Sequence, residues 1–293
     1  MISINTNNGG LFAAKAASQS QAAIDSAMQR LSTGSRINNA KDDAAGQAIA
    51  TRLTAEIQGL EIASRNVADG QSLVDTAEGA LQETHTLLLR MREIGVQAAN
   101  GTLSTSDNQA LDAEFQQLVK EIDRIAQNTT WAGQNLLNGL SFSFQVGEGA
   151  NQTINVNIGS MSSYNPYGPT SQFGGVRDDF VGADPTIELD TVSQSQRAIE
   201  AIDIAIDYVS SERGKLGAVS NRLSSTMSNL DQIAVNLSAS QGRIQDADFA
   251  QETSNLAKNQ ILQQAATAMI AQANASKSSV LTLVRLSLIH ISE

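Results

Sequence analysis

Residue types that could do chemistry gather in one stretch, LSTGSRINNAKDDAAGQAIATRL, at residues 31–53. It combines Lys41 with the adjacent carboxylates of Asp42 and Asp43, among glycine and asparagine residues that favour turns. A phosphate loop would need GxxxxGK[ST], and a calcium loop would need D-x-[DN]-x-[DN]-G with a later glutamate, but the stretch has neither pattern. Adjacent carboxylates also point to different sides of a helix, so the two cannot act together as general acid and general base on one substrate.

A structural role fits the stretch better. Asn38 and Asn39 are typical turn residues, and aspartates are favourable near a helix N-terminus, where backbone N–H groups lack partners. The sequence therefore predicts a joint between two helices at 34–55.

Composition excludes most other chemistry. The 293 residues include no cysteine, which excludes disulfides, thiolate metal sites and cysteine nucleophiles. Two histidines, His85 and His290, are too few for a histidine-rich metal site. A net charge of −11 without any run of basic residues disfavours nucleic-acid binding. We expect no enzyme, no metal and no cofactor.

The sequence also lacks membrane signals. Its N-terminus has no basic start followed by an apolar block, and no run of about 20 apolar residues occurs. This predicts no membrane insertion and a cytoplasmic protein, unless export uses an uncleaved signal.

Heptad repeats dominate two long segments, 56–99 and 192–237. Apolar residues recur every seven positions, which is typical of helices that pack along a shared seam. The first series is Leu60, Val67, Val74, Leu81 and Leu88, and the second is Ile202, Val209, Leu216, Leu223, Leu230 and Leu237. After turn residues at 100–109, a further helix has apolar positions from Leu111 to Ile125 and ends near the polar turn QNTTWAGQNLLNG, and this half of the chain extends to residue 137.

The middle of the chain, 138–191, has a different character. FSFQV at 142–146 and TINVNI at 153–158 alternate apolar and polar residues around GEGAN, which predicts a β-hairpin. A loop rich in glycine, serine and proline follows. The fold class is therefore mainly α: an elongated rod of antiparallel long helices, with terminal coiled-coil helices and a small hairpin and loop insert.

The two ends, 1–33 and 254–285, are narrow, alanine-rich and amphipathic. Alanine contributes little transfer energy, whereas ordering costs about 1–2 kcal/mol per residue, so we expect both ends to be disordered in the monomer and to fold on association. A second joint at 238–253 contains QGRIQDADFA, which is similar to GSRINNAKDD at 34–43. If copies associate head to tail through an interface that does not close into a ring, they build a helical filament.

Motifs along the chain resemble those of bacterial flagellin over about 1–147 and 192–285. They are INTN at 4–7, LSTGSRINNAKDDAAGQAIA at 31–50, NVADGQSLVDTAEGAL at 66–81, RMREIGVQAANGT at 90–102, FQVG at 144–147, NRLSSTMSNL at 221–230, RIQDADFAQET at 243–253 and ILQQAATAMIAQAN at 261–274. The resemblance implies inner-tube helices at 1–33 and 254–285, an outer core at 56–137 and 192–237, and an outward insert at 138–191.

The resemblance also implies partners and a location. The chain would polymerise with itself, be exported unfolded through the flagellar type III apparatus without a cleaved signal, and become extracellular. Further partners would be an export chaperone at the C-terminal helix, the filament cap and hook-filament junction proteins.

The resemblance also implies that contacts at the two joints set the register in which neighbouring subunits pack. These contacts are Arg36, Ile37, Asn39, Asp42, Asp43, Arg243, Ile244, Asp246 and Asp248.

Receptor recognition is a further implication of the resemblance. Arg90, Ile94 and Glu114 match positions that the animal flagellin-sensing Toll-like receptor contacts. Many receptor-active members have leucine where this chain has Ile94, and a frequent alanine is replaced by Gly95.

Two other functions were weighed against that of flagellin, and the C-terminal end of the chain differs from the family pattern. A hook-filament junction protein has similar N-terminal motifs, and some flagellins carry a protease in the insert, but this insert has no histidine, cysteine or HExxH motif. Family members usually stop near the position of Arg285. We expect residues 286–293 to be a β-prone tail added by cloning, read-through or sequence assembly.

Overall fold

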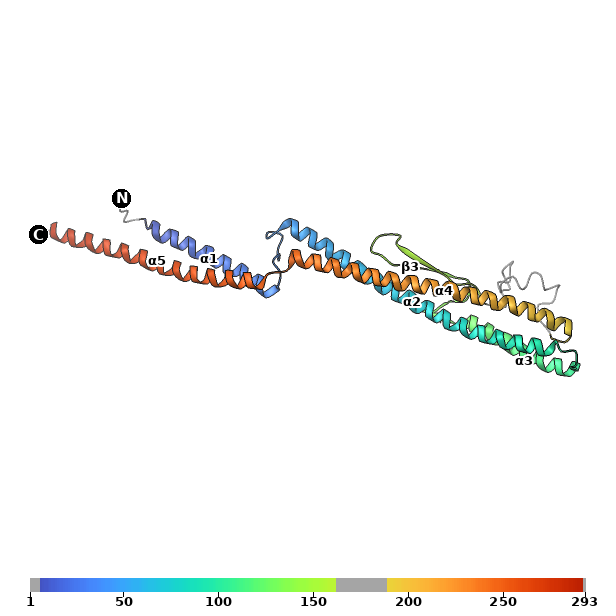
Figure 1. The fold of residues 1–293 in the computed structure, drawn as a ribbon. Coiled ribbons are helices and arrows are strands. Elements are labelled where there is room, and N and C mark those ends of the chain that lie inside the picture. Colours follow the sequence, from blue (N-terminus) through green and yellow to red (C-terminus); the bar gives the residue numbers. More distant parts are fainter. Residues whose placement is uncertain (1–5, 162–188, 292–293) are drawn as a thin grey trace. The chain divides into compact units, whose positions relative to one another are not determined.

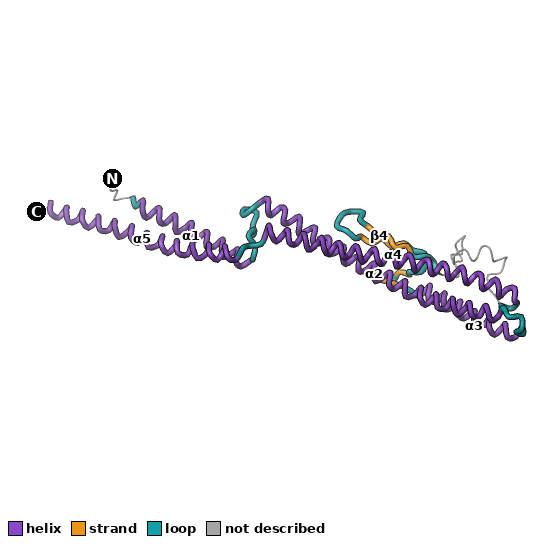
Figure 2. The backbone as a smooth tube through the Cα atoms, viewed as in Figure 1, coloured by secondary structure: helices purple, strands orange, loops and turns teal. Residues whose placement is uncertain are grey.

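A computed structural model describes residues 6–161 and 189–291 of the chain. Helices form most of the described residues, and the strands are short (Figure 2). The elements are α1 (Asn8–Thr33), α2 (Ala44–Ala98), α3 (Thr105–Asn128), β1 (Thr130–Trp131), β2 (Gln134–Asn135), β3 (Ser141–Gln145), β4 (Thr153–Asn157), α4 (Val192–Gln245) and α5 (Phe249–Ile291). The prediction of a mainly α protein with a small hairpin insert is confirmed.

The chain divides into two units. Residues 1–55 and 236–293 form the first, and residues 56–235 form the second. Helices α2 and α4 contribute residues to both.

In the first unit, α1 lies along α5 (Figure 1). The Asn7 side chain accepts a hydrogen bond from the Gly10 N–H at 3.0 Å and so caps the start of α1. Gly34 ends the helix in a left-handed conformation, with φ of 71°, which glycine adopts without strain. Asn7 Nδ2 also donates to Asn274 Oδ1 at 3.1 Å, which links the start of α1 to α5.

In the second unit, the predicted heptad positions form the core. All five positions of the α2 series are buried, as are Ile202, Val209, Leu216, Leu223 and Leu230 of α4. The last position of the α4 series, Leu237, belongs to the first unit and is half-buried. Arg213 of α4 donates to Glu78 of α2 at 2.8 Å, and Arg92 of α2 donates to Asp203 of α4 at 2.6 Å. The seam and these ion pairs hold α2 and α4 together.

The insert is anchored to this core. Strands β3 and β4 pair antiparallel with Ser141 opposite Asn157, within one residue of the predicted bounds. The ring of Phe144 lies so close to Gly70 of α2 that a Cβ on the glycine would come within 3.2 Å of it. Ile154 and Val156 of β4 are buried. A glycine in the α2 seam therefore makes room for the hairpin.

Both ends of the segment beyond the hairpin are fixed as well. The Met161 N–H donates to the Leu137 carbonyl at 2.9 Å, and the Leu189 N–H donates to Asp112 Oδ1 at 3.1 Å. The Met161 and Leu189 side chains are fully buried. The loop predicted after Gly159 lies mostly outside the described residues.

The breaks between helices are shorter than the predicted joints. Helix α2 already begins at Ala44, and α4 continues to Gln245, so the breaks span only 34–43 and 246–248. Gly242 does not end α4, since one glycine costs a long helix only about 1 kcal/mol relative to alanine. The expectation of a β-prone tail is wrong, because residues 286–291 continue α5 as helix.

Candidate functional site at the paired helix breaks

The two helix breaks of the first unit lie side by side. Ser35 and Asp246 form an antiparallel bridge. The Arg36 N–H donates to the Gln245 carbonyl at 2.7 Å, and the Ala247 N–H donates to the Gly34 carbonyl at 2.9 Å. The segments with similar sequences therefore meet as a short two-stranded ladder, which we call the joint.

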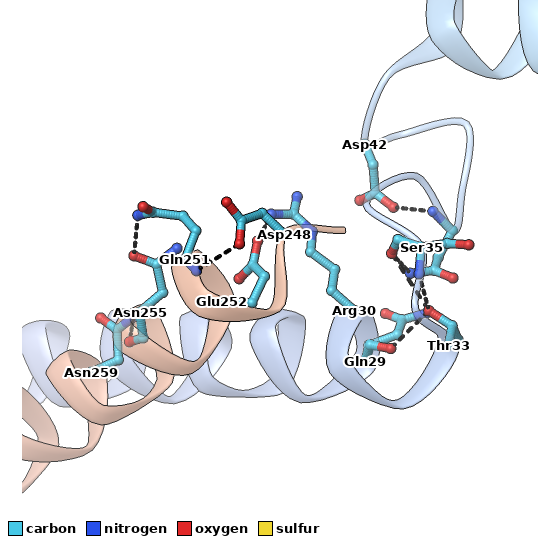
Figure 3. A network of polar contacts seen from close by, with 11 residues as sticks. Gln29, Arg30, Thr33, Ser35, Asp42, Asp248, Gln251, Glu252, Asn255 and Asn259 are labelled. Carbon is cyan, nitrogen blue, oxygen red and sulfur yellow. Dashed lines mark hydrogen bonds and ion pairs between the residues drawn. The ribbon is translucent and has the colours of Figure 1, made fainter. Parts of the chain in front are cut away.

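Asp42 closes the turn of the first break (Figure 3). Its Oδ2 accepts hydrogen bonds from the N–H groups of Asn39 at 3.0 Å and Asn38 at 3.2 Å. These bonds favour the charged carboxylate, so they hold the pKa of Asp42 below its ordinary value. The exposed Asn39 thus takes part through its backbone.

Two aspartates serve as helix caps at the joint. Asp43 Oδ1 accepts from the Gly46 N–H at 2.8 Å, in the first turn of α2. Asp248 Oδ1 accepts from the N–H groups of Ala250 at 2.9 Å and Gln251 at 3.2 Å, in the first turn of α5. The prediction that aspartates of the 31–53 stretch stand at a helix N-terminus is confirmed for Asp43.

Arg36 and Arg243 are not equivalent, although both precede isoleucine. Arg36 Nη2 reaches across the joint and donates to the Ile244 carbonyl at 2.7 Å, whereas Arg243 Nη2 donates to Ser240 of its own helix at 3.0 Å. Ile37 is buried, and Ile244 is half-buried. The first segment therefore supplies the arginine that crosses the joint.

Sequence reasoning missed an ion pair beside the joint. Arg30 Nη1 of α1 donates to Glu252 Oε1 of α5 at 2.9 Å, and the Glu252 side chain is only 10% exposed (Figure 3). A basic residue in the last turn of one helix and an acidic residue in the first turn of another both complement the helix dipoles. These opposite charges at the two helix ends were the sequence signal that could have suggested the ion pair.

The three residues that the family resemblance suggests for receptor contact do not lie on one exposed surface. Arg90 donates to Glu114 Oε1 at 2.8 Å and to Glu93 Oε2 at 3.0 Å, and these carboxylates raise its pKa above the ordinary value. Arg90 and Glu114 are exposed, but Ile94 is 1% exposed. The structure pairs two of the three residues on a surface and places the third in the core.

Apolar side chains of the first unit point outward. Phe12 is 76% exposed and Ile261 is 65% exposed. Among the side chains of α1 and α5 whose burial the structure describes, the other large apolar residues exposed are Leu11, Met28, Phe249, Leu262 and Met269. Among the described residues, no cluster of three or more histidine, cysteine, aspartate or glutamate side chains is arranged to hold a metal. Nor does any helix there have the length and apolar character needed to cross a membrane.

Comparisons with known proteins agree on one family. The model of the bacterial flagellin N-terminal helical region matches residues 4–141, and that of the C-terminal helical region matches residues 199–284. Flagellin of Bacillus subtilis is 41% identical over 302 residues, which cover 96% of this chain and 99% of the relative. The "Flagellar filament 33 kDa core protein" of Treponema phagedenis is 38% identical over 294 residues, with 96% and 99% coverage.

A solved structure supports the fold alone. The putative flagellar hook-associated protein from Vibrio parahaemolyticus has a TM-score of 0.58 at 16% identity, covering 70% of this chain and all of that one. The resemblance inferred from the motifs is confirmed by the family models and the relatives, and with it the prediction that the protein is not an enzyme. The chain belongs to the bacterial flagellin family and is a structural subunit of the flagellar filament.

Proposed function

We propose that the exposed apolar residues of α1 and α5 are the surface through which copies of this protein pack in the filament. The carrying observation is that large apolar side chains such as Phe12, Ile261 and Met269 stay in contact with water. Their burial against neighbouring copies would be worth about 1.5–3 kcal/mol for each fully covered side chain. The prediction that both ends are disordered in the monomer and fold on association stays a prediction, since α1 and α5 are helices in the structure of the single chain.

Substitution of Phe12 and Ile261 tests this surface. Phe12→Ser with Ile261→Ser is expected to abolish polymerisation in precipitating salt, measured by sedimentation and electron microscopy. Gln264→Ser, at an exposed polar position of α5, is the matched control and should polymerise normally. Long filaments formed by the double variant would refute the proposal. If the protein without substitutions formed only short assemblies, a hook-filament junction protein would be the better interpretation.

The joint is proposed to set the packing register of neighbouring subunits. Support comes from the carboxylates of Asp42 and Asp43, which accept backbone hydrogen bonds that fix the turn and the start of α2. Asp42→Ala with Asp43→Ala should impair polymerisation or change filament shape, while circular dichroism shows a folded second unit. Filaments of normal helical form from this variant would overturn the role.

Export is proposed to follow the family route, with a chaperone on the exposed face of α5 before assembly and the cap protein at the growing end. The outward apolar residues of α5 support the chaperone site. Intact mass spectrometry of filament from the source cell should show an uncleaved N-terminus. A shortened N-terminus would contradict the signal, and the same spectrum shows whether residues 286–293 belong to the mature protein.

Receptor recognition is proposed to use the exposed pair of Arg90 and Glu114. Arg90→Ala in soluble monomer should lower receptor signalling in a reporter cell assay. Arg124→Ala is the matched control, because it breaks a comparable exposed pair with Glu121 elsewhere on α3. If the two variants gave equal signalling, the proposal that Arg90 and Glu114 contact the receptor would be wrong.

A further inference from the structure

Three Asn-Gly pairs occur in the sequence, at 8–9, 100–101 and 138–139. In such a pair, the glycine backbone nitrogen can attack the asparagine Cγ. The bond between Cγ and the amide nitrogen of the side chain breaks, ammonia leaves, and a five-membered succinimide forms. Water then opens the ring to aspartate or isoaspartate, so the reaction needs water and no oxidant. Glycine favours the attack because it has no side chain to obstruct it.

The geometry around Asn100 suits this reaction. Asn100 is exposed in the turn after α2, and its Oδ1 accepts a hydrogen bond from the Thr102 N–H at 3.3 Å. This contact folds the side chain over the Gly101 peptide and polarises the amide carbon. Within the described residues, the Gly101 N–H donates no hydrogen bond, and a Cβ on Gly101 would meet nothing within 4 Å. The attacking nitrogen is free, and water can approach.

The other two pairs are held in place. Asn8 lies in the first turn of α1, where the Leu11 N–H already bonds to the Asn7 carbonyl at 2.9 Å. Asn138 pairs with Ser160, and the hydrogen bond from Met161 to Leu137 fixes the backbone just before it. Ring closure needs a rotation of the asparagine backbone, which would distort the first turn of α1 at Asn8 and the bridge to Ser160 at Asn138.

We propose that Asn100 is a site of spontaneous deamidation in the folded protein. The product puts a negative charge just beyond the C-terminal end of α2, where the helix dipole disfavours it. The isoaspartate form also adds a methylene to the backbone of the turn, which the hydrogen bond from the Leu103 N–H to the Asn100 carbonyl closes at 3.2 Å. The turn between α2 and α3 would therefore change with the age of the molecule.

Peptide mass spectrometry tests the proposal on the full-length soluble protein. After incubation at mildly alkaline pH, trypsin releases residues 93–120 between Arg92 and Lys120, and electron-transfer fragmentation locates the change. Asn100 should deamidate several-fold faster than Asn8 and Asn138 in the folded protein, and the three rates should converge in denaturant. Equal rates in the folded protein, or earlier change at Asn138, would overturn the proposal.

Two controls lie in the same peptide. Gly101→Ala has room for its methyl group, so the turn should fold normally while deamidation of Asn100 slows several-fold. Asn108 is buried in α3 and should stay unchanged. An unchanged rate in Gly101→Ala, or a mass shift that localises to Asn108, would refute the assignment. The test needs no polymer, so its result is independent of the assembly role.

Discussion

The two units orient the apolar faces of their helices in opposite ways. In the second unit, the apolar heptad positions of α2 and α4 face the core and are buried. In the first unit, α1 buries only Ser20 and Ala27, whereas Leu11, Phe12 and Met28 are exposed. The difference is one of direction: the apolar residues of the second unit are covered within the chain, whereas those of the first unit are left for the neighbouring copies that we propose.

Substituting one leucine in each unit should give the largest contrast. Leu223→Ala removes a fully buried side chain of α4 and should destabilise the second unit by about 2–5 kcal/mol. Leu11→Ala removes an exposed side chain of α1 and should change monomer stability by at most about 0.5 kcal/mol, while slowing polymerisation. Thermal unfolding of the monomer measures both, and similar losses would contradict the comparison.

The ion pairs of the two units should differ by a smaller amount. Glu252→Gln weakens a nearly buried carboxylate contact with Arg30 and should cost the assembled first unit about 1–3 kcal/mol. Glu78→Gln weakens the more exposed pair with Arg213 and should cost about 0–1 kcal/mol. Calorimetry of filament and monomer checks this. A greater loss from Glu78→Gln would reverse the order.

Acid should produce the smallest difference, because both units carry a capped turn with a depressed pKa. Hydrogen bonds from Asn39 and Asn38 lower the pKa of Asp42, and those from Ser104 lower that of Asp107. Each carboxylate stabilises its turn above the ordinary pKa of 3.8, and this contribution is lost as pH falls through the lower folded value. Asp42→Asn and Asp107→Asn should each remove the corresponding acid-dependent step, followed by NMR titration. A step that persists in its own variant would contradict the assignment.

Local patterns in the sequence predicted most of the fold. The heptads located the buried seam, and alternation placed the β3–β4 hairpin within one residue. The extent of α4 through Gln245 was missed, because packing outweighs the weak propensity of Gly242. At the site, aspartate caps were predictable from local rules. The charges of Arg30 and Glu252 at their helix ends were visible in the sequence, but which residue pairs with which was not, since 222 residues separate them.

The receptor positions show another limit. A motif match identifies Arg90, Ile94 and Glu114 together, but it carries no information on which side of the helix is covered. Packing within the second unit buries Ile94 while leaving the charged pair in water. Burial depends on neighbouring elements that the motif does not contain.

The anchored ends of the insert make residues 161 and 189 a natural boundary for grafting. Met161 is tied to Leu137 and Leu189 to Asp112, and both side chains are enclosed by the core. Because each doubling of a flexible loop adds only about 0.6 kcal/mol of closure cost, a flexible foreign segment joined to these two anchors would cost the helices little. A polymer built from such subunits would carry the graft once per subunit, so the spacing between grafts would follow the spacing between subunits and not the size of the graft.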